Sequence, residues 1–174
     1  VRPLSSLLVI DNAEHHLTTC AKLCRAILAG APKLTILITS RHLTGVPGEQ
    51  AFAVVPLQLP PPGMPADQLG TIPSCQLFLA RSLINNRLNQ SAAEAVIRIC
   101  HRLDGLPLAL ELAAARTNVL TVHELADTLE SELSILQAPG PGGAQQLVDA
   151  MVGWTYQRLT RTEQLIFERL SVFG

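Results

Sequence analysis

The sequence contains no cluster of basic residues, and its formal net charge is only -1. Nucleic-acid-binding domains usually present a basic surface, so we expect no direct contact between this segment and DNA or RNA. No apolar stretch approaches the roughly 18 residues of a membrane-spanning helix, and no secretory signal opens the chain. We therefore expect a cytoplasmic protein that makes no membrane contact.

The chain also lacks a Cys-x-x-Cys pair, although it contains four cysteines. Cys20, Cys24, Cys75 and Cys100 lie in segments of periodic apolar residues, as buried free thiols do, which indicates a reducing compartment. His16, Cys20 and Cys24 fall on one face of a predicted helix and could hold Zn²⁺ or Cu(I). That face also carries the apolar residues expected to pack on a sheet, which favours ordinary burial.

Apolar residues make up 48% of the 174 residues and charged residues 16%, so a packed core is expected. Continuous apolar runs at 7–10 and 34–38 are typical of parallel strands buried on both faces. The segment 13–29 between them has helical spacing, which predicts a β–α–β unit. We predict a third strand at 51–55.

Beyond a Pro-rich break at 60–65 the apolar residues recur with helical spacing only. This spacing predicts helices at 74–85, 91–103, 107–118, 145–157 and from 160 to 170. Pro107 suits the first turn of its helix, because a proline there loses no hydrogen bond. Thr121–Glu124 and Thr160–Glu163 have the pattern of capping boxes, which predicts a helix after each.

Three residues near the two predicted strand ends could carry chemistry. Asp11 follows the first strand and could hold Mg²⁺ through the metal's waters, although an Asp there also caps helices. Glu14 could polarise an attacking water, but acidic residues favour helix N-termini in any case. Arg41, after the next strand, could meet a terminal phosphate; the alternative is a pair with a surface acid.

A further candidate is the segment 105–115, with the sequence GLPLALELAAA. Its glycine suits a helix stop and its proline a helix start, followed by small residues that allow close helix packing. Pro107 offers a rigid apolar face that could lie against a base. The spacing alone favours plain helix packing.

Four segments in order, LLVIDNAEHH, ILITSR, HRLDGLPLALELAAAR and RLSVFG, resemble the bacterial regulators among the STAND class of signal-transduction ATPases, relatives of the NB-ARC ATPases. The resemblance implies that Asp11 coordinates Mg²⁺ and that Glu14 lies near the hydrolytic water, both in catalytic roles. It implies that Arg41 contacts the γ-phosphate. It also implies that Gly105 and Pro107 form the nucleotide-binding G-x-P motif of a helical lid, with Pro107 on the adenine.

The implied fold class is α/β followed by all-α: the C-terminal half of a P-loop NTPase parallel sheet, a helical lid and the beginning of a winged-helix domain. The corresponding ranges are 1–58 for the nucleotide-binding part, 59–72 for a Pro-rich linker, 73–137 for the lid, 138–144 for a second linker and 145–174 for the start of the winged helix.

The sequence departs from this family in two respects. It contains no G-x-x-x-x-G-K-[ST], the loop whose backbone holds phosphates, so we expect the chain alone to bind nucleotide poorly and to be inactive. Asn12 stands where relatives often carry a second acid, which favours a slow switch. The chain starts without Met, directly before a predicted strand, and we expect an interior fragment.

The expected function is part of an ATP/ADP-dependent molecular switch that controls a signalling or transcriptional output, with ATP/ADP and Mg²⁺ as cofactors. The full-length protein would be a slow ATPase with protein partners or self-association on activation. One alternative is a nucleotide-independent helical interaction module, in effect a degenerate ATPase. Another is a different P-loop enzyme, such as a helicase-loader ATPase, that shares only the Asp11 strand.

Overall fold

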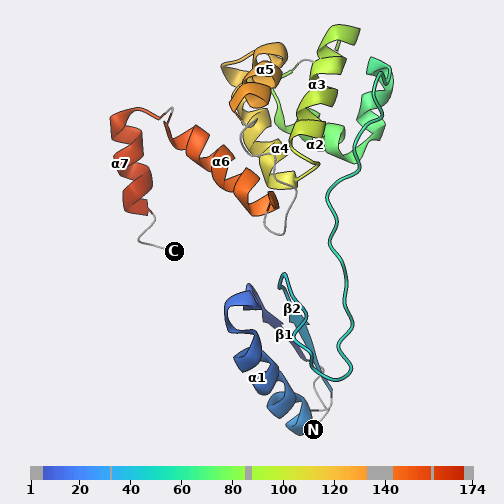
Figure 1. The fold of residues 1–174 in the computed structure, drawn as a ribbon, viewed down its shortest axis with the longest axis vertical. Coiled ribbons are helices and arrows are strands. Elements are labelled where there is room, and N and C mark those ends of the chain that lie inside the picture. Colours follow the sequence, from blue (N-terminus) through green and yellow to red (C-terminus); the bar gives the residue numbers. More distant parts are fainter. Residues whose placement is uncertain (1–5, 32, 85–87, 133–142, 158, 171–174) are drawn as a thin grey trace. The chain divides into compact units, whose positions relative to one another are not determined.

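The computed structural model of this chain consists of two units, which are described separately. The structure describes residues 6–31, 33–84, 88–132, 143–157 and 159–170. The first unit covers residues 1–54 and the second covers residues 55–174. Among the described residues, strands occur in the first unit, whereas the second unit is helical (Figure 1).

The first unit is a β–α–β arrangement. Its elements are β1 (Ser6–Ile10), the 3₁₀-helix η1 (Ala13–His16), α1 (Leu17–Gly30) and β2 (Leu34–Ile38). The two strands pair in parallel, with Leu8 opposite Ile36. This confirms the predicted β–α–β unit, and it brings the carboxyl ends of both strands to one edge of the sheet.

The two faces of this sheet differ in exposure. Buried Ala21 and Cys24 belong to α1, which packs on one face. On the other face Leu7, Val9 and Leu37 are 61%, 54% and 53% exposed. The prediction that both faces are buried is therefore wrong for the described chain, because the one long helix of this unit covers a single face.

The predicted third strand at 51–55 is not a strand. Phe52 and Val54 are both 89% exposed, and Val55 is 75% exposed. A strand requires a hydrogen-bonding neighbour, and the described sheet pairs β1 with β2 alone. Without such a neighbour, this segment of β-type composition is exposed and has no regular structure.

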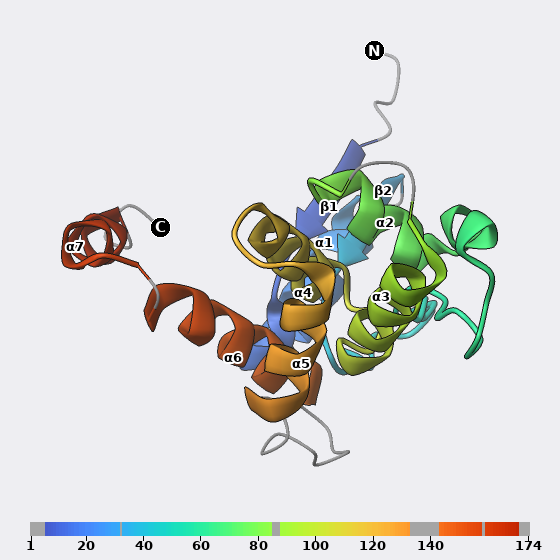
Figure 2. The ribbon, with the colours of Figure 1, turned by 90° about the horizontal axis from the view of Figure 1, so that it is seen from above.

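The second unit is built from helices. They are η2 (Ala66–Thr71), α2 (Pro73–Arg81), α3 (Gln90–Arg102), α4 (Pro107–Ala114), η3 (Ala115–Asn118), α5 (Val122–Glu132), α6 (Gly143–Gln157) and α7 (Arg161–Leu170). Helix α3 packs against α5, and α2 packs against α4 (Figures 1 and 2). The helices that periodicity predicts are all found, with ends that move by a few residues.

Side-chain caps explain several of the helix starts. Thr121 Oγ1 accepts a bond from Glu124 N at 3.3 Å, and Thr121 N donates to Glu124 Oε2 at 2.9 Å. Thr160 N donates likewise to Glu163 Oε2 at 2.7 Å. Both predicted capping boxes are confirmed, and Pro107 occupies the first turn of α4 as predicted.

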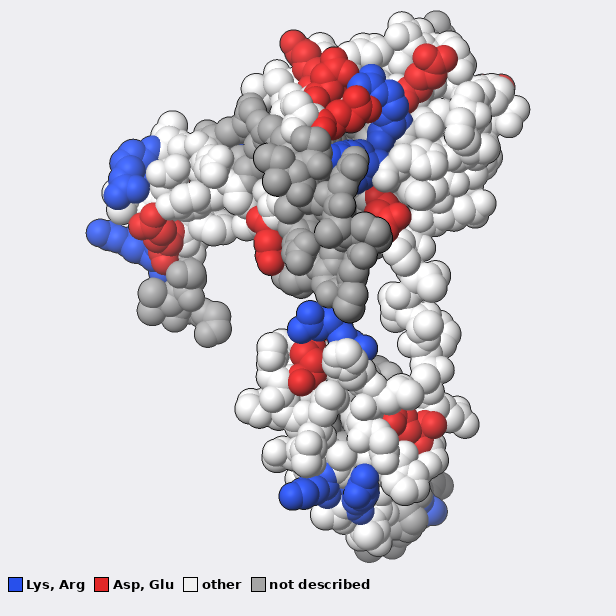
Figure 3. Space-filling model, in the orientation of Figure 1, with Lys and Arg blue, Asp and Glu red and all other residues white. Residues whose placement is uncertain are grey.

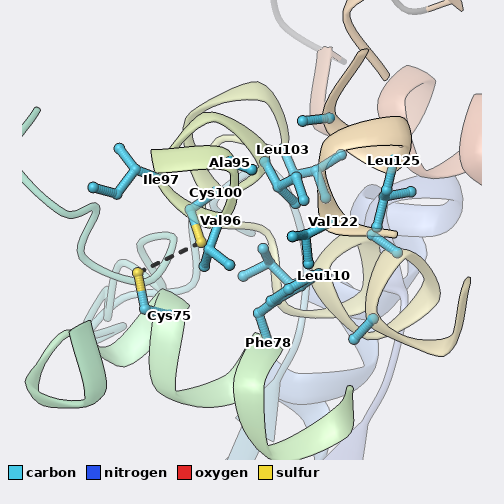
Figure 4. Packing of buried hydrophobic residues seen from close by; sticks show 14 of the residues in the cluster. Cys75, Phe78, Ala95, Val96, Ile97, Cys100, Leu103, Leu110, Val122 and Leu125 are labelled. Atoms are coloured by element: carbon cyan, nitrogen blue, oxygen red, sulfur yellow. Dashed lines mark hydrogen bonds between the residues drawn. The ribbon is translucent and has the colours of Figure 1, made fainter. Parts of the chain in front are cut away.

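The core of the second unit lies between α2, α3, α4 and α5. Phe78, Val96, Leu110 and Leu125 each come from a different one of these helices and are fully buried (Figure 4). Each such side chain stabilises the unit by about 1.5–3 kcal/mol relative to exposure. Met151 of α6 is also fully buried in this cluster.

The predicted linker at 59–72 is largely part of the helical unit. Pro60 and Leu69 are fully buried, and Ile72 is 8% exposed. The six residues of η2 form a short helix within it. The prolines break regular structure, as predicted, but the apolar residues around them still enter the core because burial requires no regular backbone.

The end of α3 and the turn between α3 and α4 are hydrogen-bonded to the segment 57–60, at the beginning of the second unit. Leu57 N donates to Gly105 O at 2.9 Å, and His101 Nε2 lies 2.7 Å from Pro60 O. Gly105 has a φ of +64°, and a Cβ built on it would lie 2.2 Å from Leu57 O. Only glycine fits this turn, for reasons of both conformation and space.

One guanidinium joins α3 to α5 on the surface. Arg98 Nε and Nη2 each donate to a carboxylate oxygen of Glu130 at 2.7 Å, and Nη2 also reaches Asp127 Oδ1 at 2.7 Å. Figure 3 shows acidic and basic side chains side by side on this unit. The bonds from Arg98 lower the pKa of Glu130 below its ordinary value.

Part of four predicted regions lies outside the described residues. These parts are 1–5 and 32 of the nucleotide-binding part, 85–87 and 133–137 of the lid, 138–142 of the second linker, and 158 and 171–174 of the expected winged-helix segment. Helices α6 and α7 within that segment are found where helices are predicted. The assignment of 145–174 to a winged-helix domain stays a prediction.

We predict that Gly105→Ala destabilises the helical unit by at least about 1–3 kcal/mol, since the added Cβ meets a positive φ and the Leu57 carbonyl. Urea unfolding followed by circular dichroism measures this. The matched control is Gly153→Ala within α6, where a Cβ has nothing within 4 Å. The control should be neutral or stabilising by up to about 1 kcal/mol. Equal effects of the two variants would contradict the role given to Gly105.

We also predict a stability change in acid that depends on Arg98. Because the folded state lowers the pKa of Glu130, its contribution is complete above the ordinary Glu value of 4.5 and is lost as pH falls through the lower folded value. Arg98→Met should reduce the loss of stability below that pH in urea titrations. Arg81→Met, which removes the exposed pair with Glu111, should leave that loss unchanged. A full acid response in Arg98→Met would refute the assignment.

Candidate functional site

The candidate site lies where β1 and β2 end side by side. Asp11 and Asn12 follow β1, and Thr39 to Arg41 follow β2. The parallel register pairs Ile10 with Ile38, so Asp11 and Thr39, the next residue along each chain segment, face each other. The sequence prediction that these two segments are neighbours is confirmed.

Thr39 connects the two strand ends through its side chain and its backbone. Its hydroxyl donates a short hydrogen bond to Asp11 Oδ1 and accepts one from Asn12 N at 2.9 Å. Its carbonyl accepts a bond from Ala13 N at 3.0 Å, and its N donates to Ile10 O at 3.0 Å. The bond from the Thr39 hydroxyl fixes Oδ1 of the Asp11 carboxylate, and the other carboxylate oxygen makes no bond to Thr39.

Asn12 sets the turn that leaves β1. Its backbone is left-handed, with φ 57° and ψ 47°, a conformation that asparagine tolerates better than most residues. With its amide nitrogen turned toward Glu14, that nitrogen lies 2.9 Å from Glu14 Oε1 and 2.8 Å from Oε2. Asn12 therefore holds the next acidic side chain rather than supplying a second acid.

Glu14 and Arg41 form an ion pair within this cluster. Arg41 Nε lies 3.0 Å from Glu14 Oε1. The Glu14 side chain is 13% exposed, whereas that of Arg41 is 58% exposed. The alternative in which Arg41 pairs with an acid thus holds in this structure, and the acid is Glu14 itself. The exposed remainder of the guanidinium can still meet an anion, because it carries several donors in a planar fork.

Gly105 and Pro107 lie in the second unit. Pro107, the first residue of α4, is exposed, and the next residue, Leu108, is 51% exposed. Together they present an apolar surface at the start of this helix. Gly105 is buried beneath Leu57, which gives it a role in shaping the turn.

The structure does not support the alternative metal site on α1. Among the described residues, no three His, Cys, Asp or Glu side chains gather in a way that could hold a metal ion. His16 is exposed and Cys24 is buried, so they do not converge with Cys20. Burial also raises the pKa of the Cys24 thiol and disfavours the thiolate that a metal would bind.

The sequence points to a hydroxyl group beside Arg41 and to Asn12 as a possible helix cap in place of a second acid, but not to the bonds that Thr39 and Asn12 make. A hydroxyl one residue past a strand end is a weak signal by itself. It gains meaning once the register shows that Thr39 faces Asp11.

No helix in the described part of the chain is long and apolar enough to cross a membrane.

Comparison with known proteins gives similarity to longer mycobacterial proteins. No family model and no solved structure matches the chain. The chain is 39% identical over 177 residues to a protein of Mycobacterium tuberculosis named as a candidate HTH-type transcriptional regulator, and equally to one of Mycobacterium bovis. The match covers 96% of this chain and 18% of each regulator.

A second group of relatives is shorter. An uncharacterised protein of Mycobacterium tuberculosis is 36% identical over 174 residues, which covers 97% of this chain and 41% of that protein. The chain thus spans less than half of the length of each of these curated relatives. It is similar to one segment of proteins named as transcriptional regulators.

We predict that Thr39→Val, which keeps the side-chain shape, removes the two hydroxyl bonds that link the end of β2 to Asp11 and Asn12. Asn12 N loses its acceptor, so its amide should exchange with solvent roughly tenfold faster, equivalent to about 1.4 kcal/mol. Hydrogen exchange followed by NMR measures this. Thr35→Val on the exposed face of β2 is the matched control and should leave the Asn12 rate unchanged. An unaltered rate in Thr39→Val would remove Thr39 from the site.

Proposed function

We propose that this chain is part of an ATP/ADP-dependent switch ATPase of the STAND class that controls transcription. The observation that carries the proposal is the cluster at the adjacent ends of β1 and β2, where Asp11, Glu14 and Arg41 are each held by a specific partner. Carboxyl ends of parallel strands are where α/β sheets bind ligands. The similarity to proteins named as transcriptional regulators supports the output.

The donor set suits Mg²⁺ bound together with a nucleotide. Mg²⁺ prefers oxygen ligands and keeps several waters, so a single carboxylate beside substrate phosphates suffices. Asp11 would hold the ion through its water shell, and the bond from Thr39 would orient the carboxylate. When bound, the ion supplies charge neutralisation at the phosphates.

Glu14 and Arg41 would act as a coupled pair. A phosphate oxygen and the Glu14 carboxylate compete for the same guanidinium, because both are anions that accept its N–H groups. Arg41 would therefore contact the γ-phosphate of ATP and remain with Glu14 when ADP is bound. Such a difference in contacts is what allows a nucleotide to shift a conformational equilibrium. Glu14, held by Asn12, would be the residue near the hydrolytic water.

The second unit would provide the lid. The exposed ring of Pro107 offers an apolar surface for adenine, while Gly105 shapes the turn that presents it. Adenine is common to ATP and ADP, so this contact would add affinity without distinguishing the two. The exposed apolar face of the β1–β2 sheet supports a further layer packed on it in the full-length protein, because parallel sheets are usually covered on both faces.

In the full-length protein ATP hydrolysis would be slow, and the DNA-binding or other output function would reside elsewhere in the longer chain. That protein would be cytoplasmic, and on activation it would bind protein partners or associate with itself. A nucleotide-independent interaction module is the outcome that remains if the full-length protein binds neither ATP nor ADP.

We predict that Arg41→Ala in the full-length protein weakens ATP binding roughly tenfold relative to ADP binding, because only ATP carries the γ-phosphate. Calorimetric titration with each nucleotide in Mg²⁺ measures the ratio. Arg81→Ala is the matched control, because Arg81 also forms an exposed pair, with Glu111 at 3.2 Å. An equal loss for ATP and ADP in Arg41→Ala would exclude a γ-phosphate contact.

A further inference from the structure

Two cysteine side chains from different helices touch in the core of the second unit. Cys75 belongs to the first turn of α2, and Cys100 lies near the end of α3. Their Sγ atoms are 3.7 Å apart, and both residues are fully buried (Figure 4). The nucleotide site uses neither thiol, so this pair has no role in the function proposed above.

The two sulfur atoms are near enough to each other for a disulfide to form. A disulfide has an S–S distance of about 2.05 Å, so the two sulfur atoms need to approach by less than about 2 Å. A change in side-chain torsion moves a sulfur atom by a distance of this order. The helices that carry the two residues therefore need not separate for a bond to form.

The two thiols are chemically different because of their places in the helices. The N-terminal end of a helix favours negative charge and the C-terminal end disfavours it. Cys75 is at the favourable end of α2, and Cys100 is at the unfavourable end of α3. The hydrogen bond between them lowers the pKa of Cys75 and raises that of Cys100. The positions in the two helices therefore favour Cys75 as the nucleophile and Cys100 as the proton donor of the pair.

We propose that Cys75 and Cys100 form a redox-active dithiol that a small peroxide converts into a disulfide joining α2 to α3. The Cys75 thiolate attacks one peroxide oxygen, the O–O bond breaks, and the leaving hydroxide takes up the proton that Cys75 released on ionising to become water. Cys100 sulfur then attacks the Cys75 sulfenic acid, and a second water leaves with the Cys100 proton. Hydrogen peroxide gains two electrons, and the two thiols lose two.

Burial sets the rate of this reaction. Because both thiols are fully buried, peroxide reaches them during local opening of the helical unit. We therefore expect oxidation over minutes to hours. The bond closes a loop between residues 25 positions apart, which restricts the unfolded chain. Oxidation should raise the melting temperature of the helical unit by roughly 5–10 °C.

The test is peptide mapping of the purified chain after hydrogen peroxide treatment, with alkylation of remaining thiols and digestion by trypsin without reductant. Cleavage at Arg41, Arg81, Arg98 and Arg102 leaves Cys75 and Cys100 in separate peptides. We expect these two peptides to be joined, with the loss of two hydrogens. Reductant should restore both thiols and the lower melting temperature.

Cys100→Ala and Cys24→Ala are the matched variants, since each removes one buried thiol. Peroxide should raise the melting temperature of Cys24→Ala as in the parent chain and leave that of Cys100→Ala unchanged. The proposal is overturned if alkylation finds Cys75 and Cys100 still reduced after peroxide has oxidised half-buried Cys20. It is also overturned if the two peptides are joined only after the chain is unfolded in urea.

Discussion

The parallel pairing of β1 with β2 is the constraint on which the candidate site depends. Parallel strands end at the same edge, so their register decides which side chains meet there. Here Ile10 pairs with Ile38, and Asp11 and Thr39 consequently face each other one residue later. A slip of one residue would turn Thr39 to the other face of the sheet and leave the Asp11 carboxylate without its orienting bond.

Most helices and strands could be predicted because the signals that specify each of them lie within its own short stretch of sequence. Apolar spacing places the helices, and the capping boxes at Thr121 and Thr160 place two of their starts. The strand predicted at 51–55 fails because strand formation depends on a neighbour that local sequence does not specify. The same limitation explains why the linker prediction at 59–72 misses the burial of Leu69.

The candidate site could likewise be predicted from the sequence only in part. Asp11, Glu14 and Arg41 could be selected from residue type and position alone, and the structure brings all three into one hydrogen-bonded cluster. The partners that hold them could not be selected in this way. Thr39 and Asp11 are 28 residues apart in sequence, and their bond exists only because the register brings them together. Asn12 acts through its left-handed backbone and its contact with Glu14, and an asparagine after a strand does not by itself specify either.

The bond between Leu57 and Gly105 also limits how far the two units can separate. The first unit holds the chain as far as Glu49, whose carboxylate accepts bonds from Thr44 N and Gly45 N. The second unit holds it from Leu57 onward. The stretch between these anchors spans at most about 30 Å when fully extended. A tether this short keeps the two units at a high effective concentration for one another, whatever their relative orientation.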